Sequence, residues 1–83
     1  MRSPYFLIKI FAGDRPVSRF GVIISKAVFK KAVDRNRLKR LIFDFIQKKQ
    51  SGFKNGDYLI IALASASQLE NRNSVFAELE KIF

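Results

Sequence analysis

Residues 35–40 read Arg-Asn-Arg-Leu-Lys-Arg and place four cations within six residues. The apolar spacing of the residues that follow predicts that this run opens a helix. Because the N-terminus of a helix carries positive partial charge, several cations at this place are locally unfavourable. A bound polyanion would offset that cost. The chemistry favoured by this segment is therefore the binding of a negatively charged macromolecule.

The positive charge of the chain is concentrated in its middle. Residues 26–54 hold ten of the sixteen lysines and arginines and two of the seven acidic residues, which gives +8 of the net charge of +9. Residues 55–83 carry a net charge of −2. A localised basic surface on a small domain is the usual electrostatic footprint of nucleic-acid binding.

The residue types narrow the possible enzyme chemistry. The chain has no cysteine and no histidine, so it lacks thiol nucleophiles, the commonest general base and the commonest nitrogen ligand of metals. Its seven carboxylates show no paired spacing that would hold a catalytic metal. We therefore expect no catalytic residue and no tightly bound cofactor in the protein. The lack of cysteine is compatible with a reducing cytosol, and we expect a cytoplasmic protein.

The 83 residues predict one α/β domain, residues 1–83, with the order β-β-α-β-α. The predicted strands are residues 5–12, 19–25 and 57–64, and the predicted helices are residues 32–49 and 74–83. The turn residues Gly-Asp-Arg-Pro at 13–16 favour a hairpin of the first two strands. The third strand is nearly all apolar, which is typical of burial on both faces. No apolar run approaches the ~20 residues that span a bilayer, and the interrupted N-terminal apolar segment favours a strand over a signal peptide.

Periodicity assigns the side chains of these elements to faces. The apolar stripe of the first helix is Leu38, Leu41, Ile42, Phe45 and Ile46. Phe43 falls on the opposite, cationic face, where it could stack on a base, cover a loop or pack on a partner, and these interpretations stay open. In the first strand the expected core residues are Phe6, Ile8 and Ile10, and the other face holds Tyr5, Leu7, Lys9 and Phe11. Before the last helix, Ser67 with Glu70 fits a capping box, and Asn73 is another possible N-cap.

Two stretches together resemble the protein subunit of bacterial ribonuclease P. They are residues 19–26 (Arg-Phe-Gly-Val-Ile-Ile-Ser-Lys) and 30–42 (Lys-Lys-Ala-Val-Asp-Arg-Asn-Arg-Leu-Lys-Arg-Leu-Ile). That family has a strand ending in a small residue and lysine, then a basic loop, then an Arg-Asn-Arg-x-Lys-Arg signature that opens a helix. Residues 57–62 and 69–81 resemble its next strand and its final connection and helix. The helix and loop that usually precede the first strand of the family have no counterpart in this sequence.

The resemblance implies a two-layer α/β (α+β) sandwich of ribosomal-protein-like fold. It also implies a left-handed β-α-β crossover through the signature helix, a sense that is rare among such units. In this family the RNA subunit uses Mg²⁺ to remove the 5′ leader from precursor tRNA, and the protein binds the catalytic RNA and the leader. The implied partners are thus the catalytic RNA of ribonuclease P and precursor tRNA, with no membrane, and Mg²⁺ is bound mainly by the RNA. The oligomeric state stays open.

Carried over onto this sequence, the family's RNA-binding residues are Lys26, Lys30, Lys31, Arg35, Asn36, Arg37, Lys39 and Arg40. Tyr5 and Lys9 are candidates for contact with the leader, with ordinary half-buried strand residues as the alternative. Several other functions also stay open. The basic run could be a plain solvated helix face, and the chain could be a general RNA-binding or ribosome-associated module, a DNA-binding module or a self-sufficient nuclease.

Overall fold

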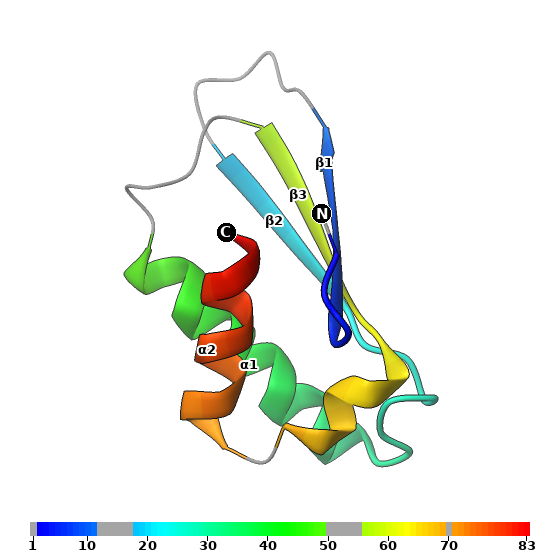
Figure 1. Ribbon diagram of the computed structural model, residues 1–83. Coiled ribbons are helices and arrows are strands. Elements are labelled where there is room, and N and C mark those ends of the chain that lie inside the picture. Colours follow the sequence, from blue (N-terminus) through cyan, green and yellow to red (C-terminus); the bar gives the residue numbers. More distant parts are fainter. Residues whose placement is uncertain (1, 12–17, 50–55, 70) are drawn as a thin grey trace.

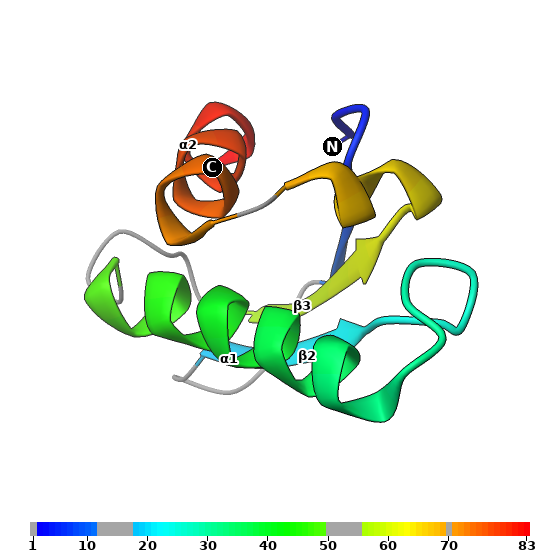
Figure 2. The same cartoon turned by 90° about the horizontal axis from the view of Figure 1, so that it is seen from below.

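The computed structural model describes residues 2–11, 18–49, 56–69 and 71–83. Its elements follow one another as β1 (Phe6–Phe11), β2 (Ser18–Ile23), α1 (Ala32–Lys48), β3 (Gly56–Ala62), the short 3-10 helix η2 (Ala64–Gln68) and α2 (Arg72–Ile82). The strands form a three-stranded sheet, and side chains of α1 and α2 pack into one core with one face of that sheet (Figures 1 and 2). The predicted order and the two-layer α+β class are confirmed, and η2, which begins at the last residue of the predicted third strand, was not predicted.

The order of strands in the sheet is β1-β3-β2, so β3 lies in the centre. β1 pairs with β3 antiparallel, with Ile8 opposite Ile60, and β2 pairs with β3 parallel, with Val22 opposite Ile60. The predicted hairpin of the first two strands is therefore wrong. The chain passes through α1 before it adds β3 between the two earlier strands, as parallel pairing with β2 requires a long crossover. Residues 13–16, on which the hairpin prediction rested, lie outside the described residues.

The side chains of β3 alternate between a covered and an open face of the sheet. Ile60 and Ala62 are buried in the core that the helices share, and Tyr58 is buried with its ring stacked on Phe20. On the other face, Asp57, Leu59 and Ile61 are only half-buried. The prediction that this strand is buried on both faces is wrong, because both helices cover the same face. Ile10 was predicted in the core but is 49% exposed, since it lies toward the end of β1 that extends past the helices (Figure 1).

The core confirms the predicted stripe of the first helix. Leu38, Ile42, Phe45 and Ile46 are buried, and Leu41 is partly buried against them. They meet Phe6 and Ile8 of β1, Ile60 of β3, and Val75 and Leu79 of α2.

Contacts between α1 and α2 fix the orientation of the basic helix. The ring of Phe45 lies edge-on to Phe76, with 5.4 Å between ring centroids. Two ion pairs connect the same helices, Lys49 with Glu80 at 2.5 Å and Arg72 with Asp44 at 3.0 Å. Because α1 is held in this way on its inner side, its outer side is left to face solvent.

The N-terminus of α2 is capped by Asn71. Its side-chain Oδ1 accepts from the backbone N–H of Ser74 at 2.9 Å, and the Oγ of Ser74 accepts from the backbone N–H of Asn71 at 3.3 Å. This is a reciprocal capping box, two residues before the N-cap predicted at Asn73. Ser67 instead donates to the carbonyl of Ala64, and Glu70 lies outside the described residues. Within the described ranges, no helix has both the length and the apolar character needed to cross a bilayer.

Candidate nucleic-acid interface

A compact basic loop, residues 24–31, connects β2 to α1. The backbone N–H of Val28 donates to the carbonyl of Ser25 at 3.1 Å, and the side chain of Val28 is buried in the core. Because Val28 anchors the loop, the charged side chains around it are left on the surface. The three predicted RNA-binding lysines of this loop, Lys26, Lys30 and Lys31, are all exposed.

Arg35 holds this loop against the start of α1. Its Nη1 donates to the backbone carbonyls of Phe29 and Lys30, each at 2.9 Å. The side chain is half-buried rather than fully exposed. Arg35 therefore has a structural role in shaping the basic surface, which sequence reasoning missed because the two acceptors are backbone atoms of a loop.

The start of α1 is itself weakly capped. Lys31 occupies the N-cap position with an extended backbone, and its side chain makes no capping hydrogen bond. Asp34 supplies the acidic residue of the first turn, which complements the positive end of the helix dipole.

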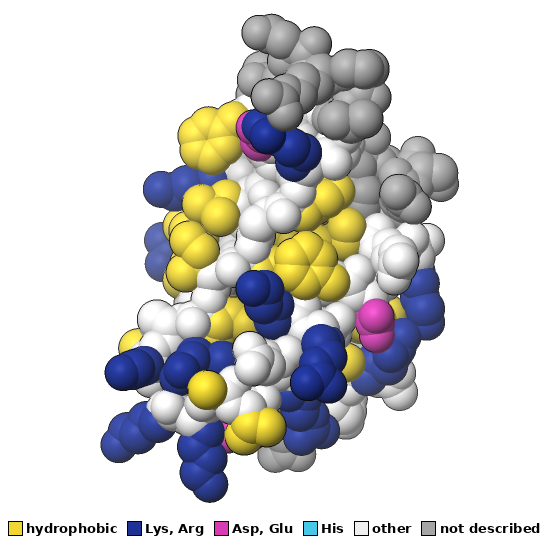
Figure 3. All heavy atoms as spheres, turned by 180° about the vertical axis from the view of Figure 1, so that it is seen from behind, with side chains coloured by type: hydrophobic (Ala, Val, Ile, Leu, Met, Phe, Trp, Pro, Cys, Tyr) yellow, Lys and Arg dark blue, Asp and Glu magenta, His cyan; other side chains and the backbone are white. Residues whose placement is uncertain are grey.

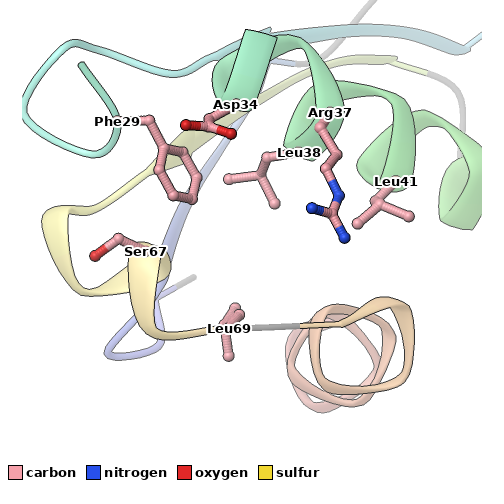
Figure 4. A pocket seen from close by; sticks show the side chains of 7 residues that line it. All are labelled: Phe29, Asp34, Arg37, Leu38, Leu41, Ser67 and Leu69. Atoms are coloured by element: carbon pink, nitrogen blue, oxygen red, sulfur yellow. The ribbon is translucent and has the colours of Figure 1, made fainter. Parts of the chain in front are cut away.

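Arg37 lies on a different flank of α1 and borders a pocket of about 210 Å³. Figure 4 shows its guanidinium pointing into the space between α1 and the chain that leads from η2 to α2. The pocket is lined by four apolar and three polar or charged side chains. Its lining residues are Phe29, Asp34, Arg37, Leu38, Leu41, Ser67 and Leu69.

The outer face of α1 carries the rest of the signature. Asn36, Lys39 and Arg40 are exposed and border a shallow hollow of about 520 Å³ together with Phe43 and Asp44. The polar residues of the signature thus divide in three: Arg35 contacts the loop, Arg37 borders the pocket, and Asn36, Lys39 and Arg40 lie on the outer face.

The open face of the sheet is apolar with charged groups at its margins. Leu7, Phe11, Leu59 and Ile61 alternate on this face with the buried residues of the same strands, and Lys9 lies opposite Leu59. In Figure 3, which views the molecule from behind, hydrophobic side chains gather over the strands and lysines and arginines lie around and below them. Of the two predicted leader contacts, Lys9 is exposed on this face, whereas Tyr5 precedes β1 and packs half-buried against the core.

An ion pair at one end of this face was missed by sequence reasoning. The Nε and Nη2 of Arg19 donate to the two carboxylate oxygens of Asp57, each at 2.8 Å. The hydrogen bond and the negative charge of Asp57 raise the pKa of Arg19 above its usual value. The pair borders a shallow pocket of about 430 Å³ that also contains Phe11, Gly21 and Leu59. It could be found only once the parallel register placed these residues opposite each other.

The described carboxylates do not gather into a metal site. No group of three His, Cys, Asp or Glu side chains comes together among the residues that the structure describes. Four carboxylates lie in ion pairs with cations: Asp44 with Arg72, Asp57 with Arg19, Glu78 with Lys81, and Glu80 with Lys49.

Solved structures share this fold. The ribonuclease P protein of Staphylococcus aureus superposes with a TM-score of 0.91 at 23% identity, covering 99% of this chain and 74% of that one. The ribonuclease P protein of Thermotoga maritima superposes with a TM-score of 0.89 at 21% identity, covering 99% and 79%. Superposition this close requires the same strand order and the same hand of the β2-α1-β3 crossover, so the crossover implied by the resemblance is kept here.

Sequence relatives give the family. A ribonuclease P protein component of Vibrio vulnificus is 36% identical over 81 residues, which cover 98% of this chain and 64% of the relative. That of Pseudoalteromonas atlantica is 30% identical over 81 residues, covering 98% and 67%. The chain thus spans about two thirds of the length of these curated relatives. The sequence profile of the family described as Ribonuclease P matches residues 1–83. The chain belongs to the ribonuclease P protein family.

Proposed function

We propose that this chain is the protein subunit of ribonuclease P. It binds the catalytic RNA through the basic loop and α1, contacts the 5′ leader of precursor tRNA with the open face of the sheet, and so assists removal of the leader. Family membership supports the activity. The main structural support for an RNA-binding surface formed by the loop and α1 is the pair of hydrogen bonds from Arg35 to the loop carbonyls. These bonds hold the loop, with its lysines, beside the cations of α1.

Binding of the catalytic RNA rests on phosphate contacts. Lys26, Lys30 and Lys31 are exposed on the loop, and Lys39 and Arg40 are exposed on the helix that begins beside it. Each cation that neutralises a phosphate releases condensed counterions, so the affinity should fall steeply with salt. The planar fork of an arginine also suits bidentate contacts with phosphates and base edges.

The open sheet face offers a surface of a different kind to the leader. It is apolar over its centre, with Phe11 54% exposed and Leu59 and Ile61 half-buried. Bases of a single strand can lie on apolar and aromatic side chains whatever their sequence, while cations such as Lys9 approach the backbone. This face therefore supports binding that depends on the presence of a leader rather than on its exact sequence.

We assign the magnesium ions to the RNA. Mg²⁺ keeps several waters and binds readily to phosphate oxygens, which a folded RNA supplies in number. Four described carboxylates of this protein pair with its own cations, and we assign to its residues the binding and orienting of the two RNAs.

The test is cleavage of 5′-labelled precursor tRNA at low magnesium. Protein alone, bacterial catalytic RNA alone and the mixture are compared, each with a precursor carrying a long leader and one carrying a single-nucleotide leader. We expect stimulation by the mixture only, and a larger stimulation with the long leader. A Lys9→Gln variant should lose part of the long-leader stimulation and keep the rest.

Three outcomes would contradict the proposal in different ways. Cleavage by the protein alone would make it a nuclease in its own right. RNA binding without any stimulation would leave a general RNA-binding module. Equal stimulation of both precursors would mean that the open face of the sheet does not contact the leader, and the assignment as a ribonuclease P subunit would stand.

A further inference from the structure

Phe43 is an aromatic side chain on the wrong side of α1 for a core residue. It is 37% exposed, whereas Leu38, Ile42, Phe45 and Ile46 of the same helix are buried on the opposite side. Among the described residues, Phe43 belongs neither to the core cluster nor to the side chains packed against it. Packing within the described part of the protein therefore does not account for an aromatic side chain at this position.

The neighbours of Phe43 are polar and cationic. Asn36, Arg40 and Phe43 are spaced by four and then three residues, which places them in one row along the helix surface, and Lys39 is four residues before Phe43. These side chains border the shallow hollow of about 520 Å³ on the outer face of α1. The acid at its margin, Asp44, lies in an ion pair with Arg72 at 3.0 Å, so the row itself stays positively charged.

We propose that Phe43 is a stacking platform for one unpaired base of the bound RNA. The base lies on the ring, Lys39 and Arg40 contact the phosphates that flank it, and the amide of Asn36 faces the base edge. A nucleotide combines a flat ring with a negative charge, and this row offers a partner for each. The inference rests on the proposed function, because it assumes that the outer face of α1 binds RNA.

The first test compares the affinity of catalytic RNA for three variants at position 43. Phe43→Ala should weaken binding about tenfold, since stacking on an aromatic side chain is lost. Phe43→Leu keeps the apolar volume without the ring and should also weaken binding, whereas Phe43→Tyr should bind like the parent chain. The slope of affinity against salt should be the same in all three, because no charge changes. Lys39→Gln is the matched control and should lower both affinity and slope.

The second test uses the absence of tryptophan from the chain. A Phe43→Trp variant carries a single indole, and stacking of a base on it should quench its fluorescence when catalytic RNA is added without precursor tRNA. Phe11→Trp, on the open sheet face, is the control and should keep its fluorescence under the same conditions.

The outcomes separate the two proposals. If the parent chain does not bind catalytic RNA, the proposed function fails first. If the parent binds and both Phe43→Leu and Phe43→Ala bind catalytic RNA as tightly as the parent, the stacking platform is refuted and the proposed function stands. Binding by Phe43→Trp without quenching would also refute it. Helix content measured by circular dichroism shows that each variant is folded before its affinity is compared.

Discussion

Arg35 differs from its neighbours in the signature because its partners are part of the protein. Its Nη1 donates to the carbonyls of Phe29 and Lys30, and these bonds close the basic loop onto α1. The neighbouring Arg40 is exposed on the outer face of the same helix. A substitution of Arg35 that weakens RNA binding would therefore act partly through the shape of the loop.

We predict that Arg35→Ala lowers the free energy of unfolding by about 1 kcal/mol, since two hydrogen bonds from a charged donor to backbone carbonyls are lost, one of them partly buried. Urea denaturation measures this value. Arg40→Ala is the matched control and should change stability by less than about 0.5 kcal/mol, as is usual for exposed positions. Equal stability of the two variants would mean that Arg35 does not hold the loop.

At the scale of the elements, local sequence patterns predicted the buried face of α1 correctly but did not predict how the strands pair. The spacing of Leu38, Ile42 and Phe45 is a property of the helix alone, and it identified the buried stripe. The position of β3 between β1 and β2 depends on the path of the chain through α1, which no local pattern contains. The open face was predicted for the first strand but missed for β3. The apolar side chains of β3 looked like a strand buried on both faces until the helices were seen to cover only one.

The N-cap of α2 is a role for which the sequence offers two neighbouring asparagines. Asn71 accepts from Ser74 and completes the capping box, while Asn73 lies inside the first turn and is exposed. We predict that Asn71→Ala lowers the free energy of unfolding by about 1 kcal/mol, the usual cost of losing an N-cap. Asn73→Ala should have almost no effect in the same thermal or urea unfolding experiment. A larger loss at Asn73 would place the start of α2 later in the chain.

At the scale of the whole molecule, the two layers of the sandwich separate two kinds of surface. The basic loop and α1 present cations, and the uncovered face of the sheet presents apolar side chains with Lys9 and the pair of Arg19 and Asp57 at its margins. Since the helices cover only one face of the sheet, one small domain presents both surfaces, and the proposed function assigns one RNA segment to each. Contacts made by charge and contacts made by apolar surface should therefore respond differently to salt.

This difference leads to a prediction about where the charge must lie. Lys39→Gln with Arg40→Gln removes two cations from the outer face of α1, and Lys48→Gln with Lys81→Gln removes two from the last turns of α1 and α2. Both double variants lose the same net charge. Each phosphate contact contributes about 0.7–0.9 to the slope of log affinity against log salt. The first variant should therefore lose roughly 1.5 from the slope for catalytic RNA, and the second should lose little. Equal losses in titrations over several salt concentrations would mean that the RNA responds to the overall charge of the protein and not to the surface formed by the loop and α1.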